Sequence, residues 1–288
     1  MQNTSQPPNN PTTQEPTQQA SQQATQALQA PPGAPLVVAV LGKGGDGKTT
    51  SACALADAFA TTVGWDTLVV DLDAQASLTT WLAPKLSVLA QTVDDVLMGQ
   101  AEFDQAVLQL SATLRLLPAS NALAVVEHTL DTDALGQRVV LPSEAQVVVL
   151  DTPASRPLGP TATILRSALD TADVVVIPFQ PTSMSLDAMH ETLAHVNAHE
   201  ELEDRQVPVF LLPTKVHAQS NAEAVVTALH LGKRFDGILP SVPFSRWPAK
   251  AVERRQRLRE MPGGAIQRCY DEGALDLAVA LQNVAVTA

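Results

Sequence analysis

Residues 42–49 contain the pattern in this sequence that points most directly to chemistry. They read GKGGDGKT and fit the phosphate-binding pattern G-x-x-x-x-G-K-[ST], with Gly42, Gly47, Lys48 and Thr49 at its fixed positions. Glycines in such a loop let backbone N–H groups converge on phosphate oxygens. We therefore expect Lys48 to neutralise the β and γ phosphates of a nucleotide and the Thr49 hydroxyl to bind Mg²⁺.

Three aspartates lie where apolar runs of the sequence end. Asp71 and Asp73 follow the run TLVV, and Asp151 ends the run VVVL. Carboxylates are ligands that Mg²⁺ uses in nucleotide sites, and we expect Asp151 to hold the ion directly or through water. Alternate residues of an extended segment point the same way, so Asp71 and Asp73 could share the tasks of supporting the metal shell and orienting an attacking water. The alternative for Asp73 is a cap on a helix over residues 74–82.

Short runs rich in Val, Ile and Leu must position these groups. They recur after Pro35, separated by segments with helical patterns, at residues 36–41, 67–72, 114–119, 146–151, 173–179 and 207–214. Continuous apolar runs are typical of strands buried on both faces, and alternation with helices indicates a parallel sheet. We predict one doubly wound α/β domain over residues 36–288, with a mostly parallel sheet and helices on both faces. Ligands collect at the carboxyl ends of such strands.

Residues 1–35 differ from the rest of the chain in composition. They are almost all Gln, Pro, Thr, Asn, Ser and Ala, and Glu15 is their only charged residue. Such a segment cannot bury enough apolar surface to offset its conformational entropy, so we predict a disordered tail. A tail that recruits a partner or promotes self-association is the alternative.

Several classes of protein are disfavoured by the sequence. It has no uncharged apolar stretch long enough to span a bilayer and no basic region followed by an apolar run at its start, so we expect a cytoplasmic protein without membrane contact. Cys53 and Cys269 lack the spacing of a metal site. His195 and His199 are four residues apart, which permits a metal site, but no third ligand is evident and we expect a surface helix.

Three segments together resemble motifs of the ParA/MinD superfamily of dimerising ATPases. KGGDGKTT at residues 43–50 resembles the deviant Walker A motif KGGxGK[ST], and VVDLDAQASLTTWL at residues 69–82 resembles the second motif. VVVLDTPAS at residues 147–155 resembles the Walker B motif. The resemblance covers about residues 36–270 and is nearest to the small plasmid-partition type, ParA and ParF.

The resemblance implies a role for each matching residue. Lys43 would be the signature lysine, which reaches across a nucleotide-sandwich dimer to the phosphates of the partner's ATP. Asp73 would position the hydrolytic water, Asp71 would support the magnesium shell and Thr50 would contact the α phosphate. The residues expected to contact ATP or ADP are Gly44, Gly45, Asp46, Gly47, Lys48, Thr49, Thr50, Thr214, Lys215 and Pro243. The last three belong to late loops, which hold the adenine in this superfamily.

Asp46 departs from the family pattern, which more often has a small or apolar residue at that position. A carboxylate within several ångströms of a triphosphate would cost on the order of a kcal/mol or more. Either Asp46 points away, toward a cation or across the dimer, or nucleotide affinity is reduced. A binding module that has lost hydrolysis is a further alternative, although the three aspartates Asp71, Asp73 and Asp151 argue against it.

Half of the positive charge of the chain lies near its end. Nine of eighteen Lys and Arg residues occur between residues 233 and 268 with only three acidic residues, giving +6 in a chain of net charge −12. We predict a helix over residues 248–261 that displays two adjacent basic stripes. These stripes comprise Lys250, Arg254, Arg255, Arg257 and Arg259. A solvated helix face is the alternative, whereas the resemblance implies ATP-dependent, non-specific DNA binding.

The resemblance thus favours a partition ATPase that segregates plasmid or chromosome DNA. It implies an ATP-dependent homodimer, non-specific DNA and a ParB-type centromere-binding adaptor as partners, and association with the nucleoid. Besides the binding module, three alternatives remain: a ParA-like ATPase that positions a protein cargo, a MinD-like membrane-associated division regulator and a metal-cluster ATPase. The second needs a basic amphipathic helix at the C-terminus, but residues 274–288 have no Lys or Arg. The third needs bridging cysteines.

Overall fold

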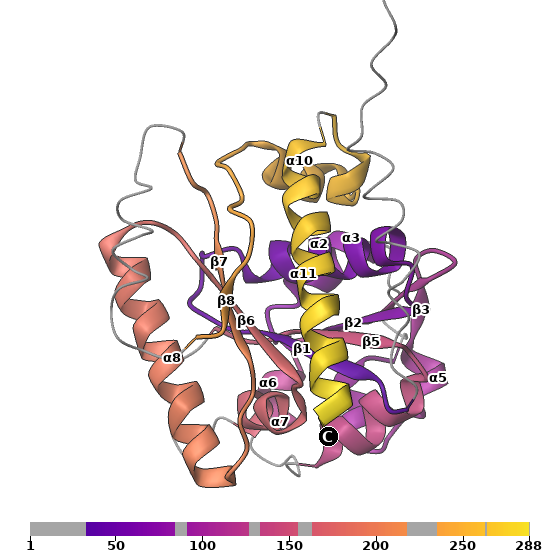
Figure 1. Cartoon of the computed structure of the whole chain (residues 1–288). Helices are drawn as coiled ribbons and strands as arrows, with labels where there is room; N and C mark the ends of the chain where they lie inside the picture. The colour runs from indigo at the N-terminus through magenta and orange to yellow at the C-terminus, as the bar shows by residue number, and fades with distance from the viewer. Residues whose placement is uncertain are drawn as a thin grey trace, which may run out of the picture.

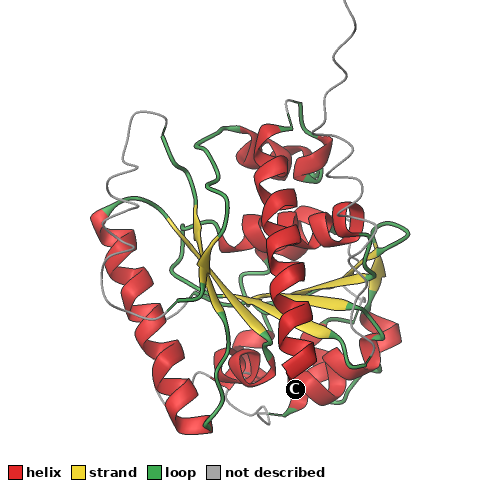
Figure 2. Ribbon diagram, in the orientation of Figure 1, coloured by secondary structure: helices red, strands yellow, loops and turns green. Residues whose placement is uncertain are grey.

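A computed structural model describes residues 33–83, 91–126, 133–154, 163–217, 235–262 and 264–287, with side chains in the last helix to residue 282. An eight-stranded sheet runs through the molecule with helices on both faces (Figures 1 and 2). The predicted doubly wound, mostly parallel α/β architecture is confirmed. The predicted tail lies outside the described residues except for residues 33–35, and Lys233 and Arg234 also lie outside them.

The strand order is β3-β4-β2-β5-β1-β6-β7-β8, and only the pairing of β3 with β4 is antiparallel. The strands are β1 (Leu36–Val40), β2 (Thr67–Asp71), β3 (Leu108–Gln109), β4 (Leu114–Leu117), β5 (Val147–Asp151), β6 (Val174–Phe179), β7 (Val209–Pro213) and β8 (Gly237–Ile238). All six predicted runs form strands. The short strands β3 and β8 were not predicted, because two residues carry no readable pattern.

Helices on the two faces of the sheet build two separate apolar cores. One core joins α2 (Lys48–Ala58), its π-helical continuation η1 (Phe59–Val63), α3 (Ser77–Leu82), α10 (Trp247–Arg254), η5 (Leu258–Glu260) and α11 (Ala265–Thr287). The other joins α4 (Val93–Leu97), α5 (Phe103–Ala106), α6 (Leu123–Val126), η3 (Gly136–Val140), α7 (Thr163–Thr171) and α8 (Ser183–Glu203). The 3₁₀ turn η4 (Leu141–Ser143) follows η3, and its Leu141 is exposed. The central strands are therefore buried on both sides, as their continuous apolar runs predict.

Helix α2 follows the glycine-rich loop and lies between the sheet and α11 (Figure 1). A helix covered on two sides needs small residues, and Ala52, Ala54, Ala56 and Ala58 are all buried. Cys53 is buried in the same core, so it is not placed to bridge a metal cluster. The close packing fixes the helix that carries the end of the loop.

Helix α11 is part of this core. Its residues Ile266, Tyr270, Ala274, Leu277 and Leu281 are buried against the α2 side of the sheet. Up to residue 282, where its side chains are described, α11 thus packs its apolar face against the core. A membrane-binding helix would need that face to be exposed. Within the described residues, no helix combines the length and hydropathy needed to cross a bilayer.

The prediction of one helix over residues 248–261 is wrong. Helix α10 ends at Arg254, and Arg255 adopts a left-handed conformation with φ of 55° that turns the chain. A separate 3₁₀ turn, η5, follows at Leu258–Glu260. The two basic stripes expected on a continuous helix therefore do not form.

Candidate functional site

The polar residues singled out from the sequence converge at one edge of the sheet. In the parallel register, Val40 and Asp71 both lie opposite Asp151, which places the ends of β1, β2 and β5 side by side. Phe179 at the end of β6 lies opposite Pro213 at the end of β7. The loop after β1 thus meets groups from four other strands at the place where doubly wound sheets bind ligands.

The glycine-rich loop has the backbone that a phosphate nest requires. Gly42 and Gly47 have φ angles of 143° and 94°, which other residues rarely adopt. A Cβ atom on Gly42 would also lie 3.4 Å from the carbonyl oxygen of Pro178. Gly47 immediately precedes α2, so the N–H groups of the first helical turn face the loop.

Lys48 is buried, and its ammonium donates a hydrogen bond to the carbonyl oxygen of Lys43 at 3.1 Å. Burial lowers the pKa of Lys48, and this effect is opposed by the charges of Asp151, Asp73 and Asp46. The ammonium is therefore surrounded by carboxylates and rests on a backbone carbonyl of its own loop. A bound phosphate would give it a stronger, charged acceptor.

The carbonyl groups in the middle of the loop are held by side chains that follow β7. Lys215 Nζ donates to the Gly45 carbonyl at 2.7 Å, and Thr214 Oγ1 donates to the Asp46 carbonyl at 2.9 Å. Val216 forms a bridge with Pro243, which brings Pro243 beside the same segment. The structure therefore brings together all three residues assigned to the adenine loops, while Thr214 and Lys215 themselves bind the phosphate loop.

Asp46 faces the scaffold. Its side chain is 5% exposed, and its Oδ1 accepts a hydrogen bond from Gln180 Nε2 at 3.0 Å. The carboxylate is therefore directed toward a neutral amide of the same chain, and not toward a cation or across a dimer as the sequence suggested. Gln180 was not among the predicted site residues, although it directly follows the end of β6 as the other polar groups follow their strands.

Asp71 is fully buried and links β2 to α3. Its Oδ2 accepts hydrogen bonds from the Thr79 amide at 2.9 Å and the Thr79 hydroxyl at 2.8 Å, while Oδ1 accepts from the Asp73 amide at 3.2 Å. Burial raises the pKa of Asp71 to about 6, and these hydrogen bonds act in the opposite direction. Both oxygens are thus occupied by the chain, so a contribution of Asp71 to a magnesium shell would be indirect in this arrangement.

Asp73 lies on the turn between β2 and α3 and is partly exposed. Its Oδ1 accepts a hydrogen bond from the Gln75 amide at 2.9 Å, and its carbonyl accepts one from the Ala76 amide at 2.8 Å. The helix itself begins at Ser77. Asp73 therefore caps the turn rather than the helix, and it leaves a carboxylate near Lys48 at the edge of the loop.

Asp151 is the buried carboxylate that the chain leaves unsatisfied. Neither of its oxygens has a hydrogen-bond partner among the described residues, although its exposed fraction is zero. Burial and the neighbouring Asp71 raise its pKa well above the usual range, and the Thr49 hydroxyl and Lys48 ammonium oppose this only in part. A buried carboxylate beside the loop hydroxyl is the arrangement that a divalent cation would stabilise, so the residues fit Mg²⁺.

Lys43 points toward α8. Its half-buried side chain lines a hollow of about 290 Å³ together with Asp187, Glu191 and His195. No hydrogen bond or ion pair of its ammonium occurs within the described part of the chain. The Lys43 side chain therefore extends away from the loop toward α8, whereas the Lys48 side chain folds back onto the loop.

Two of the predicted DNA contacts, Arg257 and Arg259, are partly buried and form ion pairs with a buried carboxylate. Arg257 Nη1 and Arg259 Nε donate to the two oxygens of Asp57 at 2.8 and 2.7 Å. Arg259 Nη2 also donates to Asp271 Oδ1 at 2.6 Å, and Asp57 on α2 is only 1% exposed. The prediction that Arg257 and Arg259 lie on a solvent-facing stripe is wrong, because the buried carboxylate of Asp57 draws both toward α2.

The remaining basic residues lie on α10. Arg254 and Arg255 are exposed, and Lys250 is half-buried with its ammonium 5.4 Å from the centre of the Trp247 ring. Arg246, which was not predicted, lies over the same ring at 5.4 Å. We call Arg246, Lys250, Arg254 and Arg255 the α10 basic surface.

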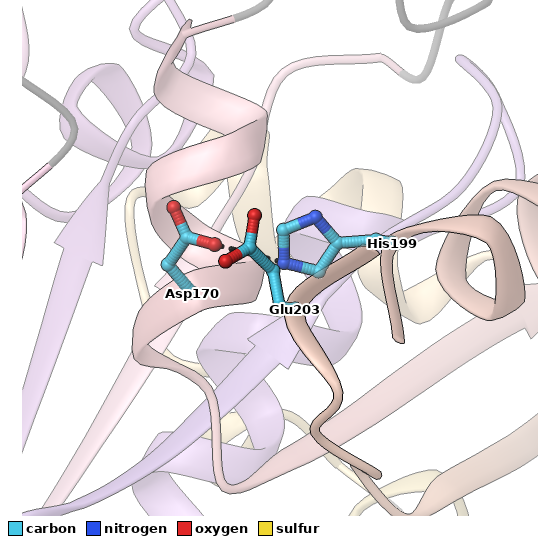
Figure 3. A group of neighbouring side chains, drawn as sticks. All are labelled: Asp170, His199 and Glu203. Atoms are coloured by element: carbon cyan, nitrogen blue, oxygen red, sulfur yellow. Dashed lines mark ion pairs between the residues drawn. The ribbon is translucent and has the colours of Figure 1, made fainter. Parts of the chain in front are cut away.

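A group of potential metal ligands occurs away from this edge, between α7 and α8 (Figure 3). His199 Nε2 lies 2.8 Å from Asp170 Oδ1, and Arg166 Nη2 lies 2.8 Å from Glu203 Oε1. Sequence reasoning found no third ligand for His199, and the structure supplies two carboxylates. These groups already satisfy one another as ion pairs, so we interpret them as a link between the two helices.

The fold and the loop define the class: a P-loop nucleoside triphosphatase domain with a doubly wound sheet. A family model described as "AAA domain" matches residues 36–208, more than half of the chain, and the chain belongs to this family. The relatives it matches include proteins described as ParA family proteins. The resemblance to the ParA/MinD superfamily is thereby confirmed.

Three similar proteins illustrate the range of this group. Maintenance of carboxysome distribution protein A from Synechococcus elongatus is 27% identical over 223 residues, 73% of this chain and 86% of that protein. A solved ATP complex of a Cyanothece McdA variant has 20% identity and a TM-score of 0.72, covering 86% of this chain and 97% of that chain. A plasmid partition protein from Borrelia burgdorferi bound to AMPPNP has 20% identity and a TM-score of 0.68, covering 84% and 98%.

Proposed function

We propose that this protein is a ParA-type ATPase. It binds Mg²⁺-ATP, forms a face-to-face dimer around the nucleotide, binds DNA without sequence preference as that dimer and leaves the DNA after hydrolysis. The observation that carries the proposal is the different placement of two lysines in one loop. The Lys48 ammonium lies in the phosphate nest, whereas the Lys43 ammonium has no hydrogen-bond or ion-pair partner among the described residues. Solved relatives with bound ATP and AMPPNP support the choice of nucleotide.

Within this proposal each group has one task. Lys48 and the loop amides neutralise the phosphates, Thr50 contacts the α phosphate, and Thr49 and Asp151 hold Mg²⁺. The bound ion would offset charge that develops on the phosphates during hydrolysis. Asp73 orients the attacking water. Lys43 gains a phosphate partner only across the dimer, so ATP shifts the population toward the dimer and its loss reverses the shift.

Replacement of Asp151 by Asn tests the metal assignment. We expect Asp151→Asn to reduce Mg²⁺-dependent ATP hydrolysis at least about 100-fold, because it removes a charged metal ligand. The same change is expected to raise the free energy of unfolding of the nucleotide-free protein by on the order of 1–3 kcal/mol at neutral pH. The folded wild type must either keep the Asp151 carboxyl protonated or bury its charge, and a neutral amide avoids both costs.

The stability gain of Asp151→Asn should depend on pH. Burial raises the pKa of Asp151 in the folded state above its value in the unfolded chain, so the folded state holds this proton more tightly. At about pH 4 the proton on Asp151 contributes fully to the free energy of unfolding of the wild type. This contribution is lost as the pH rises toward the pKa of Asp151 in the folded state. Urea unfolding of both proteins from about pH 4 to 8 should show a gain that is near zero at the acidic end and grows with pH. A gain that is constant or shrinks would contradict the assignment.

The α10 basic surface is the proposed DNA contact. Its arginines are exposed to solvent, whereas Arg257 and Arg259 are engaged in ion pairs with Asp57. Binding through phosphate contacts is independent of sequence and weakens steeply with salt. The proposed contacts are charged groups that meet phosphates, so base reading is not expected.

Arg254→Ala combined with Arg255→Ala should weaken binding of the ATP-bound protein to random duplex DNA by about tenfold or more at low salt. The slope of log affinity against log salt should also become shallower by about one for each phosphate that the variant no longer binds. Filter binding or fluorescence anisotropy over a salt series measures both. Arg166→Ala is the control for loss of an arginine charge elsewhere, because it removes one positive charge from α7 on the opposite face of the sheet. Unchanged affinity and slope in the double variant would reject this surface.

We consider two candidate cargoes, DNA and a protein assembly. The three sequence motifs favour segregation of plasmid or chromosome DNA through a ParB-type adaptor, on the nucleoid, and the Borrelia partition protein has the same fold. Positioning of a protein assembly is the second candidate, favoured by the relative that maintains carboxysome distribution. Deletion of the gene separates them: cells that lose DNA would indicate partition, whereas clustered protein assemblies with normal DNA inheritance would indicate positioning.

A further inference from the structure

The middle of the phosphate loop is held from outside by the side chain of Gln180. Its Nε2 donates to the Gly45 carbonyl and to Asp46 Oδ1, both at 3.0 Å. A loop that offers N–H groups to an anion must turn its carbonyls the other way, where side-chain donors can hold them in place. Lys215 donates to the Gly45 carbonyl and Thr214 donates to the Asp46 carbonyl. Of these three residues, Gln180 is the one that also binds the Asp46 side chain.

The Asp46 side chain is the reason that this second contact matters. Asp46 lies three residues after Lys43 and two before Lys48, in the centre of the nest, and it is 5% exposed. A carboxylate there opposes the binding of any phosphate unless its direction is fixed. Gln180 supplies a neutral donor, which fixes the carboxylate without removing a positive charge from the phosphates.

The position of Gln180 is itself determined by the scaffold. It follows Phe179, the last residue of β6, and its backbone amide donates to Ser185 Oγ at 2.8 Å in the first turn of α8. Thr182 caps the same helix by accepting from the Ser185 amide. The carboxamide therefore projects from a rigid strand end, which is the kind of support that precise positioning requires.

We propose that Gln180 is a positioning residue of the phosphate loop. It holds the Asp46 carboxylate and the Gly45 carbonyl away from the phosphates, and so allows a loop with an acidic residue at its centre to bind a nucleoside triphosphate. Gln180 and Asp46 act as a pair, so the importance of one depends on the presence of the other. This inference rests on the proposed function, since it concerns the same nucleotide.

A double-mutant cycle tests the pair. The affinity for Mg²⁺-ATP and for ADP is measured by calorimetry for the wild type, Gln180→Ala, Asp46→Ala and the double variant. Gln180→Ala should weaken affinity by about tenfold or more, because a hydrogen bond to a charged group is removed and the carboxylate is released toward the phosphates. Asp46→Ala should change it by less than about threefold, and Gln180→Ala in that background should also cost less than about threefold.

An isosteric substitution separates positioning from simple packing. Gln180→Glu keeps the shape of the side chain but sets a second carboxylate against Asp46, so it should bind nucleotide more weakly than Gln180→Ala. Adding Asp46→Asn to Gln180→Glu restores a donor and an acceptor between the two positions. The Gly45 carbonyl then keeps Lys215 as its donor, so most of the affinity should be recovered. Thermal unfolding of each nucleotide-free variant confirms that it is folded.

Rescue by the change at position 46 is the decisive result. A side chain that only supports the fold would show the same loss of affinity in both backgrounds, and that outcome, or no loss at all in Gln180→Ala, would overturn the pairing. A wild-type chain that binds neither ATP nor ADP would overturn the proposed function and the pairing with it.

Discussion

Asp57→Asn is expected to lower the free energy of unfolding by about 3 kcal/mol, at the lower end of the range for breaking a buried ion pair. Asp57 is 1% exposed and accepts hydrogen bonds from both Arg257 and Arg259. Loss of its charge leaves two guanidinium groups facing a neutral amide. The cost is moderated because Arg257 retains Glu260 and Arg259 retains Asp271 as partners.

Thermal unfolding without nucleotide measures this effect. For a domain of this size each kcal/mol lowers the melting temperature by roughly 2–4 °C, so we expect a decrease of about 6–12 °C. Arg254→Ala is the control, since it removes an exposed charge close to the same segment and should change stability by no more than about 0.5 kcal/mol. If Asp57→Asn were as mild as this control, the ion-pair network would not be what holds η5 in place.

This network also connects the parts of the proposed ATPase. Asp57 lies on α2, the helix that begins at the phosphate loop, and Asp271 lies on α11. Arg259 contacts both of them from the segment that follows the α10 basic surface. The nucleotide loop and the proposed DNA surface are therefore fastened to the same buried helix.

The strands and the phosphate loop were predictable because their determinants are local. A strand buried on both faces has a continuous apolar run, which can be recognised in the sequence alone. The glycines of residues 42–47 likewise indicate a tight loop without reference to other parts of the chain. Since parallel strands end at one edge, the meeting of Asp71, Asp151 and Lys48 followed from their places after these runs.

The basic segment was not predictable in this way. Arg257 and Arg259 fit the two adjacent basic stripes expected of one continuous helix. However, Asp57 lies 200 residues before Arg257 in the chain and binds both arginines from another helix. A long-range buried carboxylate overrides the local helical pattern, and the left-handed Arg255 ends α10 early. Nothing in residues 248–261 alone signals that partner.

The aspartates and Gln180 show a similar limit. Asp71 and Asp151 occupy equivalent strand ends, yet Thr79 satisfies the first and no described residue satisfies the second. That difference depends on where α3 packs. Gln180 could have been found by applying the strand-end argument to every polar residue after an apolar run, since it follows β6 as Asp151 ends β5.

The largest functional effect is expected at Lys43. Its ammonium has no ion pair within the described residues and stands beside the loop, so its removal should leave nucleotide binding by the monomer nearly unchanged. In the proposed dimer the same group meets the partner's phosphates in a dehydrated interface. Truncation of such a charge costs about 2–5 kcal/mol, which corresponds to a decrease in dimer affinity of roughly 30-fold to several thousand-fold.

Light scattering with Mg²⁺-ATP tests whether Lys43 completes the nucleotide site across a dimer, by comparing the wild type with Lys43→Ala. ADP is the nucleotide control, and Lys250→Ala is the lysine control. We expect wild type and Lys250→Ala to shift from monomer to dimer mass with ATP and to remain monomeric with ADP. We expect Lys43→Ala to bind ATP and stay monomeric. Dimers that form equally well with Lys43→Ala, or a wild type that stays monomeric with ATP, would contradict the proposed role of Lys43.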